Sequence, residues 1–165
     1  MVVRIDASIA EVAICWILSM SYAARTTTNN QAEYSGLLEG LRACQRGRWT
    51  PLHVIGDSVM IIRQQTGRKP LHTAHLAPLY HQSRRIADML RVLSWSHHLR
   101  AYHKMADSLA NVAMDRRQSQ QLAPAWPAQR TSPWSAALEH VASDVSHWLE
   151  SQSNERPSTL EDDAL

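Results

Sequence analysis

The chain has 165 residues, 44% of them hydrophobic and 19% charged, which suffices for one globular domain with an appendage. Its two cysteines, Cys15 and Cys44, lie in apolar stretches without CxxC spacing, which favours buried thiols in a reducing compartment over a disulfide framework or a zinc site. We expect both cysteines to be core residues.

Charge is distributed unevenly along the chain. Residues 1–130 hold 16 Lys and Arg against 8 Asp and Glu, whereas residues 131–165 hold 1 against 7. A basic body favours a polyanionic partner, although charge alone agrees equally well with a solubilising surface.

The apolar run over residues 12–20 has to be weighed as a signal peptide or a membrane anchor. Asp6 and Glu11 precede it, whereas the leading segment of a signal peptide is net positive. The run is also shorter than the roughly 20 apolar residues of a spanning helix. We therefore expect an intracellular protein, of cytoplasm or nucleus, without a membrane partner.

Two strands are predicted at the start of the chain, over residues 2–5 and 12–20, which are rich in β-branched and large apolar side chains and contain no Gly or Pro. The run 26–30 consists of residues that cap helices. Apolar positions at helical spacing follow it and predict a helix over 31–45.

A short buried strand is predicted over 52–57, which ends on the carboxylate of Asp57. Ser58 then opens a helix that Gly67 closes. The order of strand, acid and helix places a functional group at the carboxyl edge of a sheet.

The following residues predict a helix over 76–90, a strand over 92–97 and a last core helix from about Lys104. Strands that alternate with helices after an opening hairpin-like pair indicate a mixed sheet in an α/β domain.

We expect this domain to cover residues 1–117, followed by a Gln-, Pro- and Ser-rich linker over 118–133. An amphipathic helix over 134–150 carries one apolar stripe, which packs on the body or on a partner. The acidic tail 151–165 is predicted to be disordered.

Three acids stand at locally awkward positions: Glu33 in the first turn of a helix, Asp57 at the end of a buried strand, and Asp107 early in the last core helix. Each alone has an ordinary explanation as a dipole, capping or solvated residue.

Together, the segments 27–34, 55–58 and 106–111 closely resemble three motifs of type 1 ribonuclease H, in that family's order. The resemblance covers about residues 2–117 and implies an α/β fold of the ribonuclease H kind, with a mixed β-sheet flanked by helices. It further implies a monomeric, retroelement-type endonuclease that cuts the RNA of an RNA/DNA hybrid, as part of a reverse-transcriptase polyprotein.

The same resemblance implies that Glu33, Asp57 and Asp107 are catalytic carboxylates that hold two Mg²⁺ (or Mn²⁺) ions, about 4 Å apart. One ion would activate water and the other would neutralise the leaving oxygen. His98 falls where the family has a mobile histidine that assists product release or proton transfer.

Substrate contacts are implied for several further residues. Ser58 would contact a phosphate or orient Asp57, and Asn29 and Asn30 would contact base edges or sugars, with helix capping as an equally good explanation. Five arginines are predicted phosphate contacts: Arg25, Arg46, Arg48, Arg63 and Arg100.

His103 stands four residues before the last acid, where the family usually has an asparagine. An imidazole can donate or accept a hydrogen bond as the amide does, but one neutral nitrogen cannot do both. A zinc site of His97, His98 and His103 is not expected, because cysteine partners and helical spacing are missing.

The sequence departs from the family at its first catalytic aspartate, which lies on the opening strand and is followed by a glycine-rich turn. No glycine occurs here before Gly36. Either Asp6 supplies the ligand in a remodelled turn, or residues 2–5 are the family's second strand, so that the first strand and its ligand are missing. We favour the second explanation, because residues 6–33 are too few for a turn and two strands.

Three functions follow as hypotheses: a hybrid ribonuclease, a catalytically impaired remnant that binds nucleic acid, and a different nuclease of the same fold that prefers duplex DNA. The family resemblance makes the first the leading hypothesis.

Overall fold

The computed structural model describes residues 2–6, 11–21, 27–68, 73–122 and 134–154. The elements in chain order are β1 (Val2–Asp6), β2 (Glu11–Ser19), α1 (Asn29–Gly47), β3 (Leu52–Gly56), α2 (Val59–Gly67), α3 (Ala77–Met89), β4 (Val92–His97), the short 3-10 helix η1 (Arg100–Tyr102), α4 (Lys104–Arg116), β5 (Gln120–Leu122) and α5 (Ser135–Asn154). Within this part of the chain, every helix is too short or too polar to span a bilayer.

The strands form two sheets. β1 pairs antiparallel with β2, Val3 opposite Ile14, and β5 pairs with β2 as well. β3 and β4 pair in parallel, with Gly56 opposite His97. The predicted α/β class with both strand directions is confirmed, but the two sheets are not hydrogen-bonded to each other.

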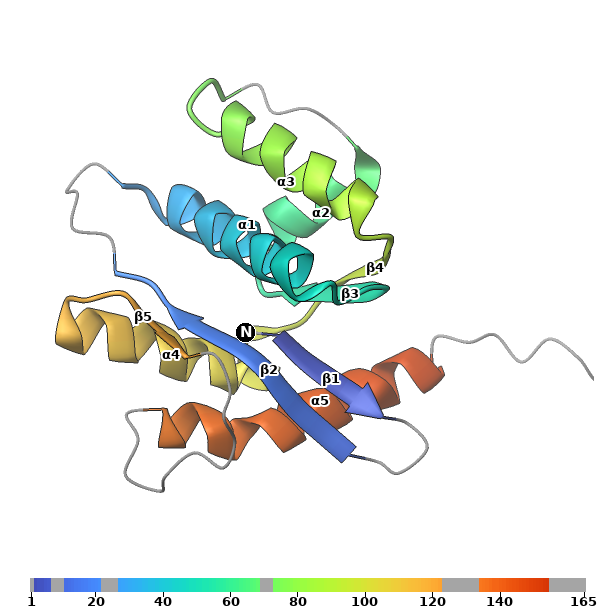
Figure 1. Cartoon of the computed structure of the whole chain (residues 1–165), viewed down its shortest axis with the longest axis vertical. Coiled ribbons are helices and arrows are strands. Elements are labelled where there is room, and N and C mark those ends of the chain that lie inside the picture. The colour runs from blue at the N-terminus through green and yellow to red at the C-terminus, as the bar shows by residue number, and fades with distance from the viewer. Residues whose placement is uncertain (1, 7–10, 22–26, 69–72, 123–133, 155–165) are drawn as a thin grey trace, which may run out of the picture.

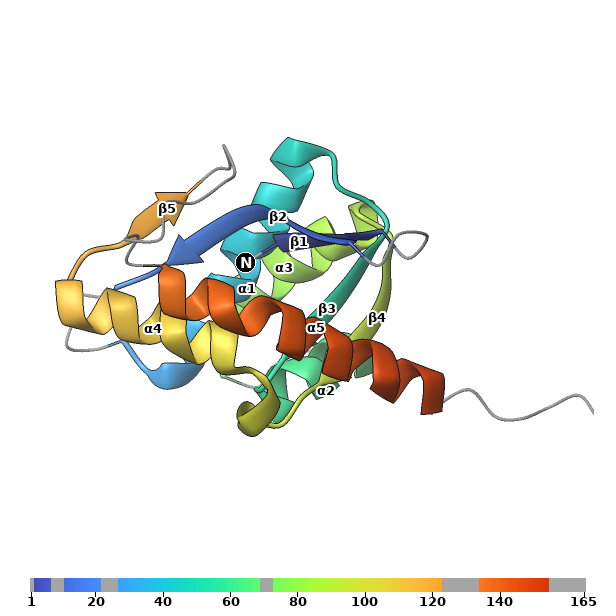
Figure 2. The ribbon, with the colours of Figure 1, turned by 90° about the horizontal axis from the view of Figure 1, so that it is seen from below.

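Helices cover both sides of the strands (Figure 1). α1 packs with α3 on one side, and α4 packs with α5 on the other. In both views, β1 of the first sheet and β3 of the second sheet are the strands that lie nearest each other (Figure 2). In the described residues, neither strand has a strand partner along that edge.

The buried side chains gather in three clusters. One joins β2, α4 and α5 through Ile17, Leu109 and Ala137, and the other two join α1 to the segments around α2 and α3. Cys44 belongs to one of them, and burial raises the pKa of its thiol to about 11. Cys15 is half-buried, and neither cysteine forms a disulfide within the part of the chain that the structure describes.

The first long helix begins two residues earlier than predicted, because Thr28 caps it. Gln31 donates its backbone N–H to the Thr28 hydroxyl at 3.3 Å, and the Thr28 N–H donates to Gln31 Oε1 at 2.9 Å. The capping role considered for Asn29 and Asn30 therefore belongs to Thr28, and both asparagines are exposed.

The C-terminal part differs from the predicted linker and tail. β5 lies inside the linker predicted over 118–133, of which residues 123–133 are outside the described chain. α5 continues through the first four residues of the tail predicted over 151–165, whose remainder is also outside it. The apolar stripe of α5 is buried in the body, where Val141 and Val145 are 5% and 6% exposed.

Four arginines occupy a backbone conformation that favours glycine. Arg48, Arg68, Arg91 and Arg117 have φ between 49° and 55°, and each follows the end of a helix. Many helices end with a residue in this left-handed conformation, which is strained for any residue that has a Cβ atom.

Replacing Arg117 by Gly should therefore raise the free energy of unfolding by about 1 kcal/mol. Arg116→Gly is the matched control, because it removes the same charge from the last residue of α4 and should destabilise. Urea unfolding of both variants measures the difference. Equal destabilisation by both would show that the left-handed position carries no strain.

Candidate active site at the carboxyl edge of β3 and β4

The parallel pairing of β3 and β4 brings their carboxyl ends to one edge. Asp57 follows β3, and His97 Nε2 lies 3.2 Å from the backbone oxygen of Asp57. The backbone N–H of His98 donates to Gly56 O at 3.0 Å. Two of the predicted site residues, Asp57 and His98, therefore follow hydrogen-bonded neighbouring strands.

The chain then turns through η1 into α4, which carries Asp107 in its first turn. Arg100 holds this carboxylate: its Nε and Nη2 donate to Asp107 Oδ1 at 2.8 and 2.7 Å. This hydrogen bond raises the pKa of Arg100, and the charge of Asp57 adds to the effect. Arg100 therefore holds one of the predicted catalytic acids, Asp107, through two hydrogen bonds.

His103 lies between these groups, directly before α4. Burial lowers the pKa of His103, while the charges of Asp57, Asp144 and Asp107 act against that shift. His103 is the N-cap residue of α4, but its side chain makes no capping hydrogen bond. The residue that replaces the family's asparagine is therefore a half-buried imidazole whose pKa is influenced by nearby carboxylates.

His98 is buried, with 7% of its surface exposed. Its ring meets the edge of His147 on α5, with centroids 5.4 Å apart. Burial lowers the pKa of His98, and the neighbouring imidazoles of His147, His103 and His97 lower it further. The mobile, accessible histidine expected here is instead packed under α5.

Glu33 is exposed and lies in the second turn of α1 rather than in the first, because the helix begins at Asn29. Magnesium and manganese require several hard oxygen ligands close together. Among the described residues, no three His, Cys, Asp or Glu side chains are grouped so that they could hold a metal ion. In this arrangement the residues do not fit the expected two-ion site, since Asp107 is engaged by Arg100.

Ser58 is the N-cap of α2, but its hydroxyl makes no capping bond and it is half-buried beside Asp57. The Ser58 hydroxyl therefore does not cap α2. Of the predicted arginines, Arg46, Arg48 and Arg63 are exposed on α1 and α2, and Arg25 lies outside the described residues.

Sequence reasoning missed the contribution of α5 to this region. Asp144 is 8% exposed, and its Oδ2 accepts a hydrogen bond of 2.9 Å from the backbone N–H of Met105. His147 stacks on Tyr102 with ring centroids 3.9 Å apart. The sequence offered one weak indication of these contacts: Asp144 and His147 lie beside the apolar stripe of the amphipathic helix, where it borders the polar face.

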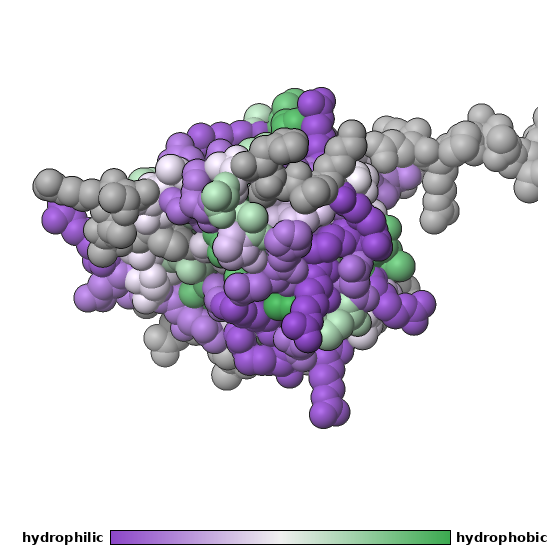
Figure 3. Space-filling model, turned by 90° about the horizontal axis from the view of Figure 1, so that it is seen from above, coloured by the Kyte–Doolittle hydropathy of each residue, from purple (hydrophilic) through white to green (hydrophobic). Residues whose placement is uncertain are grey.

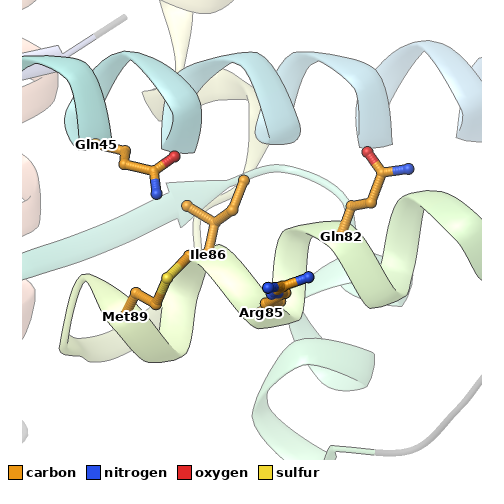
Figure 4. Close-up of a pocket in the computed structure, with 5 residues that line it drawn as sticks. All are labelled: Gln45, Gln82, Arg85, Ile86 and Met89. Carbon is orange, nitrogen blue, oxygen red and sulfur yellow. The ribbon is translucent and has the colours of Figure 1, made fainter.

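The opposite side of the molecule is different in character. Seen from the side of α3, the surface is mostly hydrophilic, with small scattered apolar spots (Figure 3). A pocket between α1 and α3 is lined by Gln45, Gln82, Arg85, Ile86 and Met89 (Figure 4). None of the candidate acids lines this pocket.

An α/β domain with acids delivered by a strand end and by the last core helix defines a ribonuclease H-like domain. The chain belongs to the family described as reverse transcriptase-like, whose model matches residues 10–113. This match confirms the resemblance inferred from the three motifs.

Known relatives agree with this family. The bifunctional protein Rv2228c of Mycobacterium tuberculosis is 36% identical over 102 residues, which cover 62% of this chain and 28% of that protein. A ribonuclease HI of Halobacterium salinarum is 33% identical over 88 residues, covering 53% of this chain and 44% of the relative. The chain therefore matches about a quarter of the first relative's length and less than half of the second's.

The solved N-terminal RNase H domain of Rv2228c from Mycobacterium tuberculosis, a fusion with maltose-binding protein, has a TM-score of 0.51 and 37% sequence identity. The superposition covers 55% of this chain and 65% of that chain.

The buried histidines predict a pH dependence of stability. Because the folded state lowers the pKa of His98 and His103, the unfolded chain binds more protons as the pH falls below about 6.5. The free energy of unfolding should therefore decrease from pH 7 to pH 5. Replacing both histidines by Asn should flatten this slope in urea titrations, whereas replacing the exposed His75 and His81 should leave it unchanged.

Proposed function

We propose that this chain is an RNA/DNA-hybrid ribonuclease domain of retroelement type, in which Asp57 and Asp107 act at one reaction centre. The single observation that carries the proposal is geometric: Asp57 directly follows β3, and the chain that leaves the paired strand β4 delivers Arg100, which donates two hydrogen bonds to Asp107 in the first turn of α4. The family membership and the likeness to a protein named ribonuclease HI support it.

The charges of the site determine how a phosphodiester could approach. Two carboxylates repel a phosphate, so that the approach needs a positive charge between them. Arg100 is the cation in contact with Asp107, and 74% of its side chain is exposed. A phosphate that docks at this edge would therefore meet Arg100 first and could share its donors with Asp107.

Recognition of the hybrid would involve the start of α1. Asn29 and Asn30 are exposed there, free of the capping role that Thr28 fills, and amide groups can bond to base edges and 2′-hydroxyls. Ser58 and His103 would contact the substrate beside Asp57. The exposed Arg46, Arg48 and Arg63 would hold phosphates of the DNA strand.

The remaining assignments stand as parts of the same proposal. Glu33 would be the third acid, and His98 would assist proton transfer or product release. The ions would be Mg²⁺ or Mn²⁺, although no catalytic step is assigned to them because the described residues form no three-ligand group. The chain would work as a monomer inside the cell, in the context of a reverse-transcriptase polyprotein.

A cleavage assay tests the proposal. The full chain should cut the labelled RNA strand of an RNA/DNA hybrid in Mg²⁺ or Mn²⁺ buffer. Asp57→Asn and Asp107→Asn should each lower the rate by roughly 100-fold or more, because each removes charge from the centre. Asp115→Asn, at an exposed acid of α4, is the control and should cleave at the original rate. Undiminished cleavage by Asp57→Asn contradicts the proposal.

A second function is favoured by one observation, the absence of a three-ligand group among the described residues. In this case the domain binds hybrids through its basic surface without cutting them. The charge of residues 1–130, with 16 Lys and Arg against 8 Asp and Glu, suits such binding.

Binding without turnover has a clear signature. Affinity for the hybrid should fall steeply with salt, since each phosphate contact releases counterions. Replacing Arg46 and Arg48 by Gln should weaken binding and reduce the salt slope by about 2, in fluorescence anisotropy titrations. A salt-independent affinity, or equal binding of duplex DNA, would argue against hybrid recognition.

A further inference from the structure

The start of α4 is capped by a residue from another helix. Met105 donates its backbone N–H to Asp144 Oδ2 at 2.9 Å, across 39 positions of sequence. The local N-cap, His103, makes no side-chain capping bond. The first N–H groups of a helix have no partner within it, and a carboxylate there also meets the positive end of the helix dipole. Asp144 thus supplies what the local sequence lacks.

The position of this cap matters because of what α4 carries. Asp107 lies two residues after Met105 in the same first turn, and its carboxylate meets Arg100 on η1. First turns fray when their N–H groups lose their acceptors. The hydrogen bond from Met105 therefore fixes the turn from which Asp107 projects.

α5 holds the preceding connection as well. His147 stacks on Tyr102 of η1 with an interplanar angle of 23°, and its ring also meets His98 at the end of β4. Asp144 and His147 are three residues apart, so both lie on one face of α5. That face contacts the connection between β4 and α4 at both of its ends.

α5 lies outside the residues 10–113 that match the family model. Its beginning nevertheless belongs to the core, since Trp134 and Ala137 pack with Ile17 and Leu109. Asp144 itself is 8% exposed, and a buried carboxylate is costly unless it is hydrogen-bonded. The cap is therefore a built contact between α4 and α5.

We propose that Asp144 is a positioning residue of the reaction centre, and that α5 sets the orientation of Asp107 through the cap on α4. The catalytic consequence rests on the proposed function. The cap and its effect on the first turn of α4 do not, so that the two can be tested separately.

Hydrogen exchange of the full chain tests the cap directly. In Asp144→Ala, the amides of residues 105–107 should exchange roughly fivefold to tenfold faster, because losing a cap destabilises a first turn by that factor. Asp144→Asn keeps an acceptor oxygen without the charge, so the exchange rates of these amides should lie between those of the unchanged chain and those of Asp144→Ala. Asp115→Ala, an exposed acid on α4, is the matched control and should leave these amides unchanged.

Activity provides the second readout. If the chain cleaves hybrid, Asp144→Ala should lower kcat with little change in KM, because it displaces Asp107 without removing a substrate contact. Asp144→Asn should recover part of kcat, which mere destabilisation would not predict at a temperature where both variants are folded.

Unchanged exchange at residues 105–107, or acceleration spread evenly over α4 and α5, overturns the proposal. If Asp144→Ala does not fold, local acceleration in Asp144→Asn decides the question in the same way. A wild-type chain that does not cleave hybrid defeats the proposed function alone, because the exchange result still shows whether Asp144 fixes the first turn of α4.

Discussion

The parallel hydrogen bonding of β3 with β4 fixes where this chain can do chemistry. It aligns Gly56 with His97, so that Asp57 and His98 leave the two strands side by side. A shift of one residue in this register would turn every side chain of a strand to the other face. The η1 turn and α4, which follow β4, then bring Arg100 and Asp107 to the same edge.

The charges at this edge balance each other only in part. Arg100 neutralises Asp107, while the partial burial of His103 lowers the pKa of its imidazole. The arrangement keeps two carboxylates near one cation instead of grouping three acids.

Much of the fold could be predicted from the sequence, because helices and strands leave periodic patterns. The opening strand pair, the long first helix and the β3–α2 junction at Asp57 agree with those patterns. The family motifs around Asp57 and Asp107 identified the class of protein. The helix after the linker was also predicted from its apolar stripe, and the structure shows that the stripe packs on the domain itself.

What could not be predicted depends on contacts between distant positions. The hydrogen bond from Met105 to Asp144 joins residues 39 apart and has no periodic signal. The ion pair of Arg100 with Asp107 depends on how η1 turns, and β5 is a three-residue strand inside a polar segment. Thr28, rather than the asparagines after it, caps α1 because Gln31 completes the capping box.

The division of the strands into two sheets has a consequence for the behaviour of the chain in solution. Along their neighbouring edges, β1 and β3 offer backbone N–H and C=O groups that no other strand of the described residues uses. Such edges are templates on which extended segments of other molecules assemble. An extended segment that paired with either strand along this seam would complete the hydrogen bonds that the two sheets leave unused there.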